Sequence, residues 1–336
     1  MTENTKIAVI GLGGIAQLVH LPNLAKLEKV TVTAVAEINK NRLNTIGDKF
    51  NIPERYKDHT ELLAKSDAEA VIVATPTSLH KDVSIACLKA GKHVLVEKPL
   101  ARTYQEAKLI TEAAKKYNRK IMVGMNLRYR PDAMILKSIL NAGEIGQPFY
   151  VKCGWIRRRS SDQKWFTRKI DSGGGVIIDL TILLLDLALW ALGFPQVDTV
   201  STQSFYQNTK EVEDTSISLL RCKNSSVISI ESSWSLSVEK DQFYFEVFGT
   251  NGSTSLNPFR IYKKIEEQMI DLTPSQSDNA IILLRKSYMN ELKSFIGAVK
   301  GLNPVFSSAD ESLSRMKIIE AMYKSSSLKK EIKLSL

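Results

Sequence analysis

The stretch Lys6-Ile-Ala-Val-Ile-Gly11-Leu-Gly13-Gly14-Ile-Ala16 decides the fold of this chain. Its apolar, β-branched run, residues 7–10, ends directly in glycines, as a buried strand does before a tight turn into a helix. In such a turn Gly11 permits the sharp bend, Gly13 lets the backbone approach a pyrophosphate, and Ala16 lets the helix pack on the sheet. The unpaired N–H groups at the start of the helix favour negative charge. The stretch therefore predicts a dinucleotide-binding turn.

A carboxylate at the right distance strengthens this interpretation. Residues 30–36 form a second apolar run, and Glu37 stands at its end, about 20 residues beyond the glycines, where an acid can accept both ribose hydroxyls. A plain turn is the alternative for the glycines alone, but strand, helix and acid together favour the dinucleotide. Because Glu37 would repel a 2′-phosphate, we expect NAD, while Lys40 and Arg42 nearby leave NADP open.

Residues 1–127 alternate short apolar runs with helical segments, which is typical of an α/β domain with a doubly wound parallel sheet, the Rossmann fold. Strands are expected at 70–74, 93–97 and 120–124, and helices at 80–90 and 103–117. Ligands of such sheets lie at the carboxyl ends of the strands. The expected cofactor-binding residues are Gly11, Leu12, Gly13, Gly14, Ile15, Glu37, Thr75, Pro76, His80, Glu97, Lys98 and Asn126.

Residues 128–336 change to β-rich runs with short turns, which indicates a C-terminal α+β domain around an open, mainly antiparallel sheet. The expected strands cover 149–155, 198–205, 214–220, 226–234, 242–248 and 253–257. Helices are expected at 130–146, 180–192, 282–300 and 310–324, and the last two should pack back on the first domain.

Composition fits an ordinary soluble protein, with 43% hydrophobic and 24% charged residues. The net charge of +10 is spread over both halves without a nucleic-acid-binding motif, so we expect no nucleic acid partner. The apolar run 176–194 contains Asp179 and Asp186, which argues against a membrane span.

Three scattered cysteines, Cys87, Cys153 and Cys222, suit a reducing, cytoplasmic setting better than a disulfide framework and lack metal-ligand spacing, so no metal is expected. Residues 1–6 lead directly into the first strand, so we expect no signal peptide.

The first catalytic candidate is Lys98, in the sequence Glu97-Lys98-Pro99 after a buried strand. Desolvation and nearby charge can tune an amine at this edge to polarise or deprotonate a hydroxyl. Pro99 fixes its own φ and removes a donor, which keeps the turn in one conformation. A surface lysine at a strand end is the alternative.

The second candidate is Asp179, which follows Ser172-Gly-Gly-Gly175. Three glycines let the backbone approach a ligand closely. Asp179 should open a helix, where the helix dipole favours a carboxylate, and should share one face with Leu183 and Asp186. We expect Asp179 to be catalytic, and Asp179, Asp186 and Lys98 to contact substrate; an N-cap without further role is the alternative for Asp179.

A basic segment, Arg157-Arg158-Arg159 with Lys164, Arg168 and Lys169 behind it, allows two interpretations. It is either a solvated loop or the rim of a site for a carboxylated or phosphorylated substrate, with Arg157 as the candidate contact.

Motifs along almost the whole chain resemble the glucose–fructose oxidoreductase / inositol dehydrogenase / rhizopine-catabolism (Gfo/Idh/MocA) family. The matching segments are residues 11–16, 74–80, 91–99, 126–131 and 173–179. The resemblance implies an NAD(P)-binding Rossmann domain, a C-terminal α+β domain whose open sheet often mediates oligomerisation, and hydride transfer at a sugar, sugar-acid or cyclitol carbon. It also implies that Lys98 is catalytic and that Asp179 touches substrate.

One departure from that family is large. The usual pattern after the glycines is Asp-x-Gly-x-His-x-x-Asp, in which the histidine is the acid/base partner, whereas this chain has Thr181 and Leu183 at the glycine and histidine positions. General acid–base groups contribute roughly 10²–10⁴-fold to the rate. His20, His59 and His93 are interpreted as surface or structural and His80 as cofactor-side; Lys164, Lys169 and Tyr129 are conceivable substitutes.

Three hypotheses follow from this departure. The chain is an NAD(P)-dependent oxidoreductase that works without the histidine, a dinucleotide-binding sensor or partner protein without turnover, or an NAD-dependent enzyme with net non-redox sugar chemistry.

Overall fold

The computed structural model describes residues 4–158, 164–274 and 278–334, and the chain divides into two compact units. The first contains residues 1–126 and 285–314, and the second contains residues 127–284 and 315–336.

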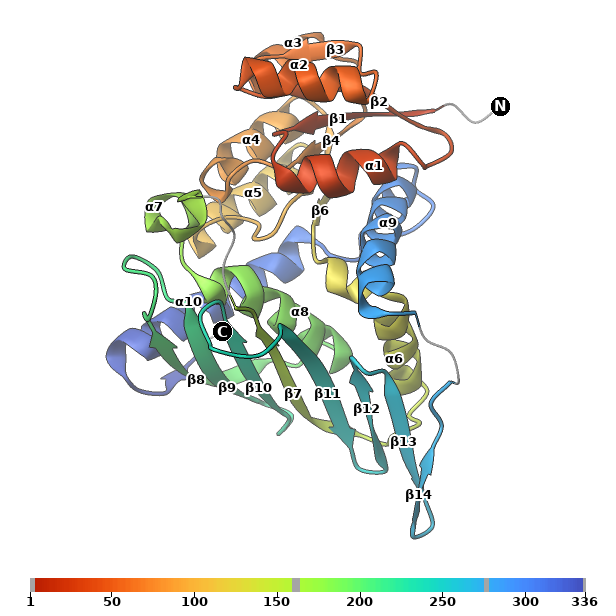
Figure 1. The fold of residues 1–336 in the computed structure, drawn as a ribbon, viewed down its shortest axis with the longest axis vertical. Coiled ribbons are helices and arrows are strands. Elements are labelled where there is room, and N and C mark those ends of the chain that lie inside the picture. The colour runs from red at the N-terminus through yellow and green to blue at the C-terminus, as the bar shows by residue number, and fades with distance from the viewer. Residues whose placement is uncertain (1–3, 159–163, 275–277, 335–336) are drawn as a thin grey trace. The chain divides into compact units, whose positions relative to one another are not determined.

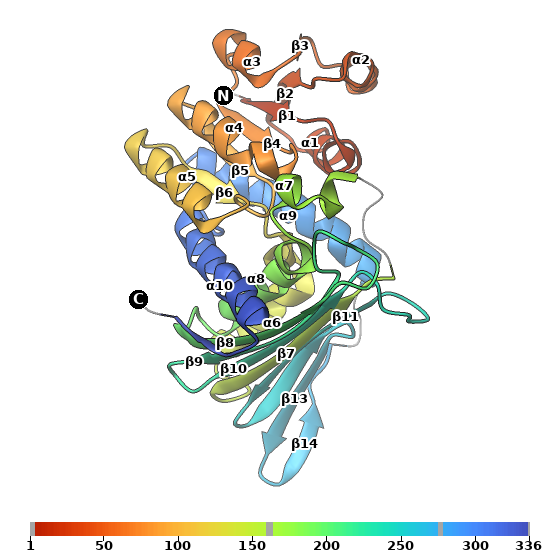
Figure 2. The ribbon, with the colours of Figure 1, turned by 90° about the vertical axis from the view of Figure 1, so that its left-hand side faces the viewer.

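The first unit is built on a six-stranded sheet in the order β3-β2-β1-β4-β5-β6, with every described pair parallel (Figure 1). This confirms the doubly wound Rossmann fold. The strands are β1 (Thr5–Ile10), β2 (Val30–Ala36), β3 (Glu54–Tyr56), β4 (Ala70–Val73), β5 (His93–Val96) and β6 (Ile121–Val123). The helices are η1 (Ala16–His20), α1 (Leu21–Leu24), α2 (Lys40–Lys49), α3 (His59–Lys65), α4 (Thr77–Lys89) and α5 (Tyr104–Lys116), and Figure 2 shows α4 and α5 packed side by side.

The central strands β1 and β4 are continuous apolar runs because both faces of a parallel sheet are covered. Sequence order reverses between these two strands, and such a switch point opens a crevice at their carboxyl ends. The residues after Ile10 and Val73, which are register partners, therefore lie where a ligand of this fold binds.

The later part of the chain completes the first unit. Most of α9 (Ala280–Val299) groups with residues 1–126, as expected. Of α10 (Ala309–Leu328), only residues 309–314 belong to that unit, and the rest belongs to the second unit, so the expectation that this helix packs on the first domain is not met over most of its length. Two hydrogen bonds join the segment of the first unit between these helices to β6 and the residue before it. The Val123 N–H donates to Ser307 O at 2.9 Å, and the Lys120 ammonium group donates to Ala298 O.

The second unit is built on a nine-stranded sheet in the order β14-β13-β12-β11-β7-β10-β9-β8-β15. Only the β7–β10 pair is parallel among the described pairs, which confirms the mainly antiparallel sheet. The strands are β7 (Pro148–Ile156), β8 (Val197–Phe205), β9 (Thr215–Cys222), β10 (Val227–Ser233), β11 (Gln242–Gly249), β12 (Gly252–Leu256), β13 (Arg260–Ile265), β14 (Gln268–Asp271) and β15 (Ile332–Lys333). The helical segments are η2 (Asn126–Tyr129), α6 (Pro131–Asn141), η3 (Lys164–Thr167), α7 (Lys169–Ser172), η4 (Ile177–Thr181) and α8 (Ile182–Ala191).

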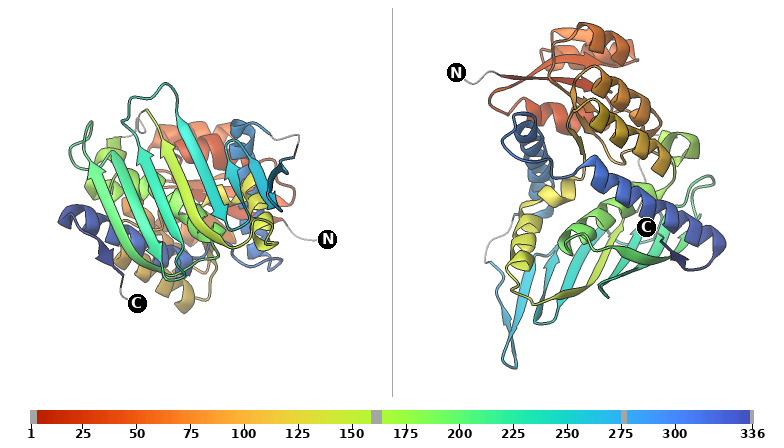
Figure 3. Two further views of the ribbon diagram at one scale, coloured as in Figure 1. Left: turned by 90° about the horizontal axis from the view of Figure 1, so that it is seen from below. Right: turned by 180° about the vertical axis from the view of Figure 1, so that it is seen from behind.

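One face of this sheet packs on α8 and the other is open, as Figure 3 shows. The strand β9 alternates buried and exposed side chains accordingly. The helical stretch Lys169–Ala191 has a mean hydropathy of 1.9, long and apolar enough to cross a membrane, but 94% of its apolar window is buried inside the chain. It is therefore a core segment of the second unit.

Candidate active site

The first part of the site is the glycine turn after β1. Gly11 has φ +91°, and a Cβ on it would lie 2.6 Å from Ala74 O, so both conformation and contact require glycine. By contrast, a Cβ on Gly13 or Gly14 would meet nothing within 4 Å. No other part of the chain therefore requires glycine at these two positions, and they leave open space beside the turn. A turn that holds a pyrophosphate requires such space.

Glu37 is fixed beside this turn at the end of β2. Its side chain is buried and accepts the Leu12 N–H at 3.0 Å and the Asn39 N–H at 2.9 Å. The guanidinium of Arg42 lies 3.4 Å from the same carboxylate. Moving Glu37 aside for a 2′-phosphate would leave two backbone donors unpaired, which favours NAD over NADP.

Two buried polar atoms at this edge have no hydrogen-bond partner among the described residues. They are Oγ1 of Thr75, two residues after β4, and Nδ1 of His20 in the helix after the glycine turn. Buried polar atoms are normally paired, so these fit a ligand that brings polar groups of its own. Together with the open space at Gly13 and Gly14, the residues present fit a dinucleotide.

Of the two interpretations given for His20, surface or structural, the structure favours the structural one, because the residue is only 1% exposed. Its Nε2 lies 2.8 Å from Oε1 of Glu97, the residue before Lys98. Burial alone would raise the pKa of Glu97, but the hydrogen bond with His20 and the charge of Lys98 outweigh it and hold the pKa below its usual value. The signal in the sequence was a polar residue four positions after Ala16, on the buried face of the helix.

Two other expected cofactor residues use their side chains within the first unit. The ring nitrogens of His80 lie 2.8 Å from Pro99 O and 3.0 Å from Thr75 O, and burial lowers the pKa of His80, so the neutral ring donates to one carbonyl at a time. Asn126 donates to Ser287 Oγ at 3.1 Å. We assign both residues to holding the turns at this edge.

Lys98 stands at the carboxyl end of β5, in the sheet that carries the glycine turn. Its backbone N–H donates to Oε2 of Glu97 at 3.2 Å, and its side chain is half-buried. The Glu97 carboxylate therefore joins three segments: the helix of His20, strand β5 and the Lys98 turn.

In the second unit, Asp179 lies in the first turn of a helix that begins after Val176, inside the π-helical turn η4. It does not cap the helix; its backbone N–H already donates to Gly175 O at 3.1 Å. Oδ2 of its carboxylate accepts the indole N–H of Trp234 at 3.3 Å. We expected residues 179, 183 and 186 to share one helix face, which assumes 3.6 residues per turn. The π-helical turn contains more residues than that, so the face is interrupted between Asp179 and the other two residues.

Two of the three glycines before Asp179, Gly174 and Gly175, are approached by other parts of the chain itself, where the sequence suggested a ligand. A Cβ on Gly174 would lie 1.9 Å from the Tyr323 hydroxyl, and a Cβ on Gly175 would lie 1.8 Å from Glu213 O. Oε1 of Glu213 accepts the N–H groups of Gly175 and Ile177 at 2.9 Å each, and the Tyr323 hydroxyl at 2.9 Å. Glu213 thus caps the helix from 38 residues away in sequence.

The buried carboxyl group of Glu213 should make the stability of the second unit depend on pH. Burial raises the pKa of Glu213 even though three donors favour its charged form. The folded state therefore binds this proton more tightly than the unfolded chain, so the stabilisation is complete below the unfolded pKa and is lost as pH rises through the folded pKa. Glu213→Gln, which keeps an acceptor oxygen, should remove this loss, whereas Glu213→Ala should lower the free energy of unfolding by about 1–3 kcal/mol per unpaired donor.

The measurement is urea unfolding between pH 4 and 8, followed by tryptophan fluorescence. All four tryptophans of the chain, at positions 155, 165, 190 and 234, lie in the second unit, so the signal reports that unit. Identical pH dependence in the wild type and Glu213→Gln would contradict the prediction.

Asp186 is not supported as a substrate residue. It is 0% exposed; the Arg128 guanidinium donates to its carboxylate at 2.7 and 2.6 Å, and the Arg315 guanidinium lies 2.7 Å from it. A carboxylate held by two buried cations orders the core, and we assign it that role.

The basic segment divides into several environments. Arg158 contacts Asp241 and Arg168 pairs with Asp171 at 2.5 Å, so these two side chains have acidic partners. Arg157 is half-buried, and its backbone N–H donates to Ser233 O at 2.8 Å, next to Trp234. Arg159 lies outside the described residues.

The two departures from the family pattern are both buried. Leu183 is 4% exposed, and the Thr181 hydroxyl pairs with the Ser232 hydroxyl. Neither side chain supplies a group that titrates near neutral pH, so the structure places no substitute for the histidine at these positions.

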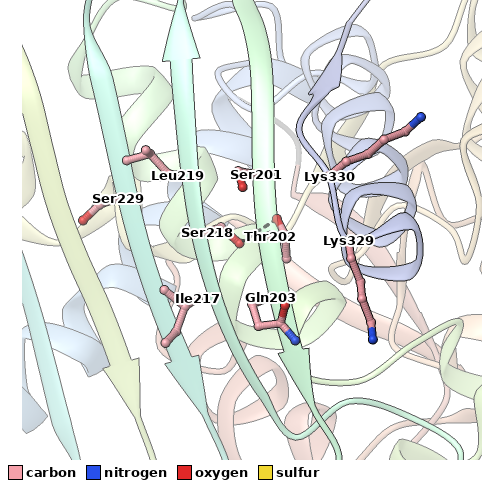
Figure 4. A pocket seen from close by; sticks show the side chains of 9 residues that line it. All are labelled: Ser201, Thr202, Gln203, Ile217, Ser218, Leu219, Ser229, Lys329 and Lys330. Atoms are coloured by element: carbon pink, nitrogen blue, oxygen red, sulfur yellow. Dashed lines mark hydrogen bonds between the residues drawn. The ribbon is translucent and has the colours of Figure 1, made fainter.

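A hollow at the part of the second unit's sheet that contains β8, β9 and β10 involves none of the candidate residues. It is lined by β8, β9 and β10 and by Lys329 and Lys330, as Figure 4 shows. Thr202 and Ser218 share a hydroxyl hydrogen bond of 3.0 Å there, while Ile217 and Leu219 are 51% and 39% exposed.

Comparison with known proteins agrees with this geometry. A family model described as an oxidoreductase family with an NAD-binding Rossmann fold matches residues 5–125, and a Gfo/Idh/MocA C-terminal domain model matches residues 134–255. Myo-inositol 2-dehydrogenase of Thermotoga maritima is 30% identical over 98% of both chains, and D-glucoside 3-dehydrogenase of Escherichia coli is 25% identical over 95% of both. The solved structure of a levoglucosan dehydrogenase with NADH and L-sorbose has the same fold, with a TM-score of 0.89, 20% identity and coverage of 99% of this chain and 100% of that one. The chain therefore belongs to the Gfo/Idh/MocA family of oxidoreductases, with an NAD-binding Rossmann domain.

Proposed function

We propose that the chain is an NAD-dependent dehydrogenase that transfers hydride to or from a hydroxyl-bearing carbon of a sugar, sugar acid or cyclitol. The observation that carries this proposal is Lys98, which follows β5 in the same parallel sheet in which β1 is followed by the open glycine turn and β2 by Glu37. The names of the two curated relatives, an inositol and a glucoside dehydrogenase, support the substrate class.

The proposed chemistry assigns one role to each candidate. When bound, the nicotinamide coenzyme supplies the acceptor or donor of the hydride. The neutral amine of Lys98 takes the hydroxyl proton as the carbonyl forms, and its ammonium form returns that proton in the reverse reaction. The Asp179 carboxylate accepts hydrogen bonds from substrate hydroxyls and orients the ring. Because Leu183 carries no proton, Lys98 performs this transfer without the family's histidine.

Arg157 is proposed to favour acidic substrates. No ion pair holds its guanidinium among residues 4–158, 164–274 and 278–334, and it follows the end of β7 beside Trp234, the partner of Asp179. A planar guanidinium binds a carboxylate through two parallel hydrogen bonds.

We also propose an oligomeric state and a cellular location for the chain. The open sheet face, with Ile217 and Leu219 exposed, is proposed to join copies of the chain into a dimer or tetramer, which light scattering would measure. A cytoplasmic location is proposed because the three cysteines are free thiols and buried.

The test is a titration with NADH and NADPH followed by a screen of inositols, glucosides and uronates at the nicotinamide absorbance band. We expect saturable binding of both dinucleotides, tighter for NADH, and turnover of at least one compound. Arg157→Ala should weaken the binding of a uronate about 10-fold relative to that of the matching neutral sugar, because one charge-assisted hydrogen bond is lost. Gly13→Leu, which fills the open space at the turn, should abolish NADH binding without changing the tryptophan-monitored unfolding of the second unit.

Each other hypothesis predicts a different outcome. Absence of binding to either dinucleotide would exclude the proposal. Binding without turnover in the wild type, but with turnover in Leu183→His, would indicate the non-catalytic protein. Conversion of a sugar without net NADH would indicate non-redox chemistry.

A further inference from the structure

Asp179 is the only half-buried residue in an otherwise buried turn. Val176, Ile177, Ile178 and Leu180 around it are all buried. A carboxylate in such surroundings needs donors that fix its direction, because the apolar neighbours offer none. Trp234, which is 55 residues away in sequence, supplies such a donor: its indole N–H lies 3.3 Å from Oδ2 of Asp179.

Trp234 itself is held on several sides. It is 3% exposed and packs in a cluster with Val176, Leu180 and Val212, with Trp155 and Phe166 at the margin. Val176 and Leu180 flank Asp179 in sequence, so the ring packs on the same helical turn to which its N–H donates. The backbone N–H of Trp234 donates to Asp214 O at 2.8 Å, which fixes the base of the side chain.

This arrangement has a chemical consequence for Asp179. An indole N–H can only donate, so its one polar contact is directed to the carboxylate. A hydrogen bond to a charged group is about twice as strong as one between neutral groups, and a ring with two torsions loses little entropy in making it. The indole therefore restricts the rotation of the carboxylate at little entropic expense.

We propose that Trp234 is a positioning residue that holds Asp179 in the orientation that binds substrate, and that it thereby sets substrate affinity. The inference rests on the proposed function, since it takes Asp179 as the residue that contacts substrate. It assigns to Trp234 a role that packing alone does not require, because phenylalanine would fill most of the same space without a donor.

The experiment compares Trp234→Phe, Asp179→Asn and the double variant, with Trp190→Phe as the matched control. Trp190 is a half-buried tryptophan of the same unit, and its aromatic ring faces the Lys137 ammonium, 5.8 Å from the ring centroid. With a substrate from the screen, Trp234→Phe should lower kcat/KM by about 10- to 100-fold, mainly through KM, with NADH affinity unchanged. In the Asp179→Asn background the same change should cause little further loss.

A second readout needs no turnover. In a ¹H–¹⁵N spectrum the indole resonance that disappears in Trp234→Phe should move in Asp179→Asn, and the resonance that disappears in Trp190→Phe should not. An unmoved Trp234 resonance, or an equal loss of kcat/KM in both backgrounds, would overturn the inference while the proposed function stands. A wild type that turns over no substrate would instead remove the proposed function, and this inference with it.

Discussion

Asp186→Asn is expected to lower the free energy of unfolding of the second unit by about 3–5 kcal/mol, the usual effect of breaking a buried ion pair from one side. The Asp186 carboxylate faces Arg128 and Arg315, and all three side chains are at most 3% exposed. Asparagine presents one oxygen and one amide NH₂, so a donor would face a donor in either orientation. Two buried guanidinium groups would then lack the negative charge that lies between them.

The measurement is urea unfolding followed by tryptophan fluorescence, which reports the second unit because every tryptophan lies there. Asp171→Asn is the matched control: Asp171 also pairs with an arginine, Arg168, but the two side chains are 22% and 57% exposed. Such pairs contribute about 0–1 kcal/mol. Equal losses in the two variants would show that burial of Asp186 is not what makes its pair important.

Much of the first unit was predictable because its signals are local. The glycine turn, the β-branched runs and Glu37 lie within one βαβ unit, and β2 has the bounds that its apolar run predicts. The β13–β14 hairpin was not predicted, because β14 is an exposed edge strand whose residues are exposed on both faces and show no alternation. The strand β3 has only three residues, all half-buried, which is too short for a period to be recognised.

The candidate residues of the second unit were recognised, but their partners were not. Asp186 meets Arg128 across 58 residues of sequence, and Asp179 meets Trp234 across 55. The glycines of residues 173–175 suggested a ligand because glycine gives the same signal whether a ligand or a side chain approaches the backbone. Only the fold shows that Tyr323 and Glu213 occupy that space.

Lys98→Met is expected to reduce kcat by about 10²–10⁴-fold, the contribution of a general acid–base group. Methionine keeps the length and apolar stem of lysine and removes the amine, so the turn between Glu97 and Pro99 should persist. Glu37 and the glycine turn are unchanged, and NADH affinity should therefore equal that of the wild type. A loss confined to kcat identifies an interaction made in the transition state rather than in binding.

Lys89→Met is the matched control, because Lys89 is an exposed lysine at the end of α4 in the same unit and should be neutral in both measurements. The loss in Lys98→Met should lie toward the upper end of the range, since Leu183 leaves no histidine to share the proton transfer. If Leu183→His restores part of the lost turnover in the Lys98→Met background, a second proton-carrying group can act at this site. Full turnover in Lys98→Met would exclude the amine as the acid–base group, whatever the coenzyme affinity.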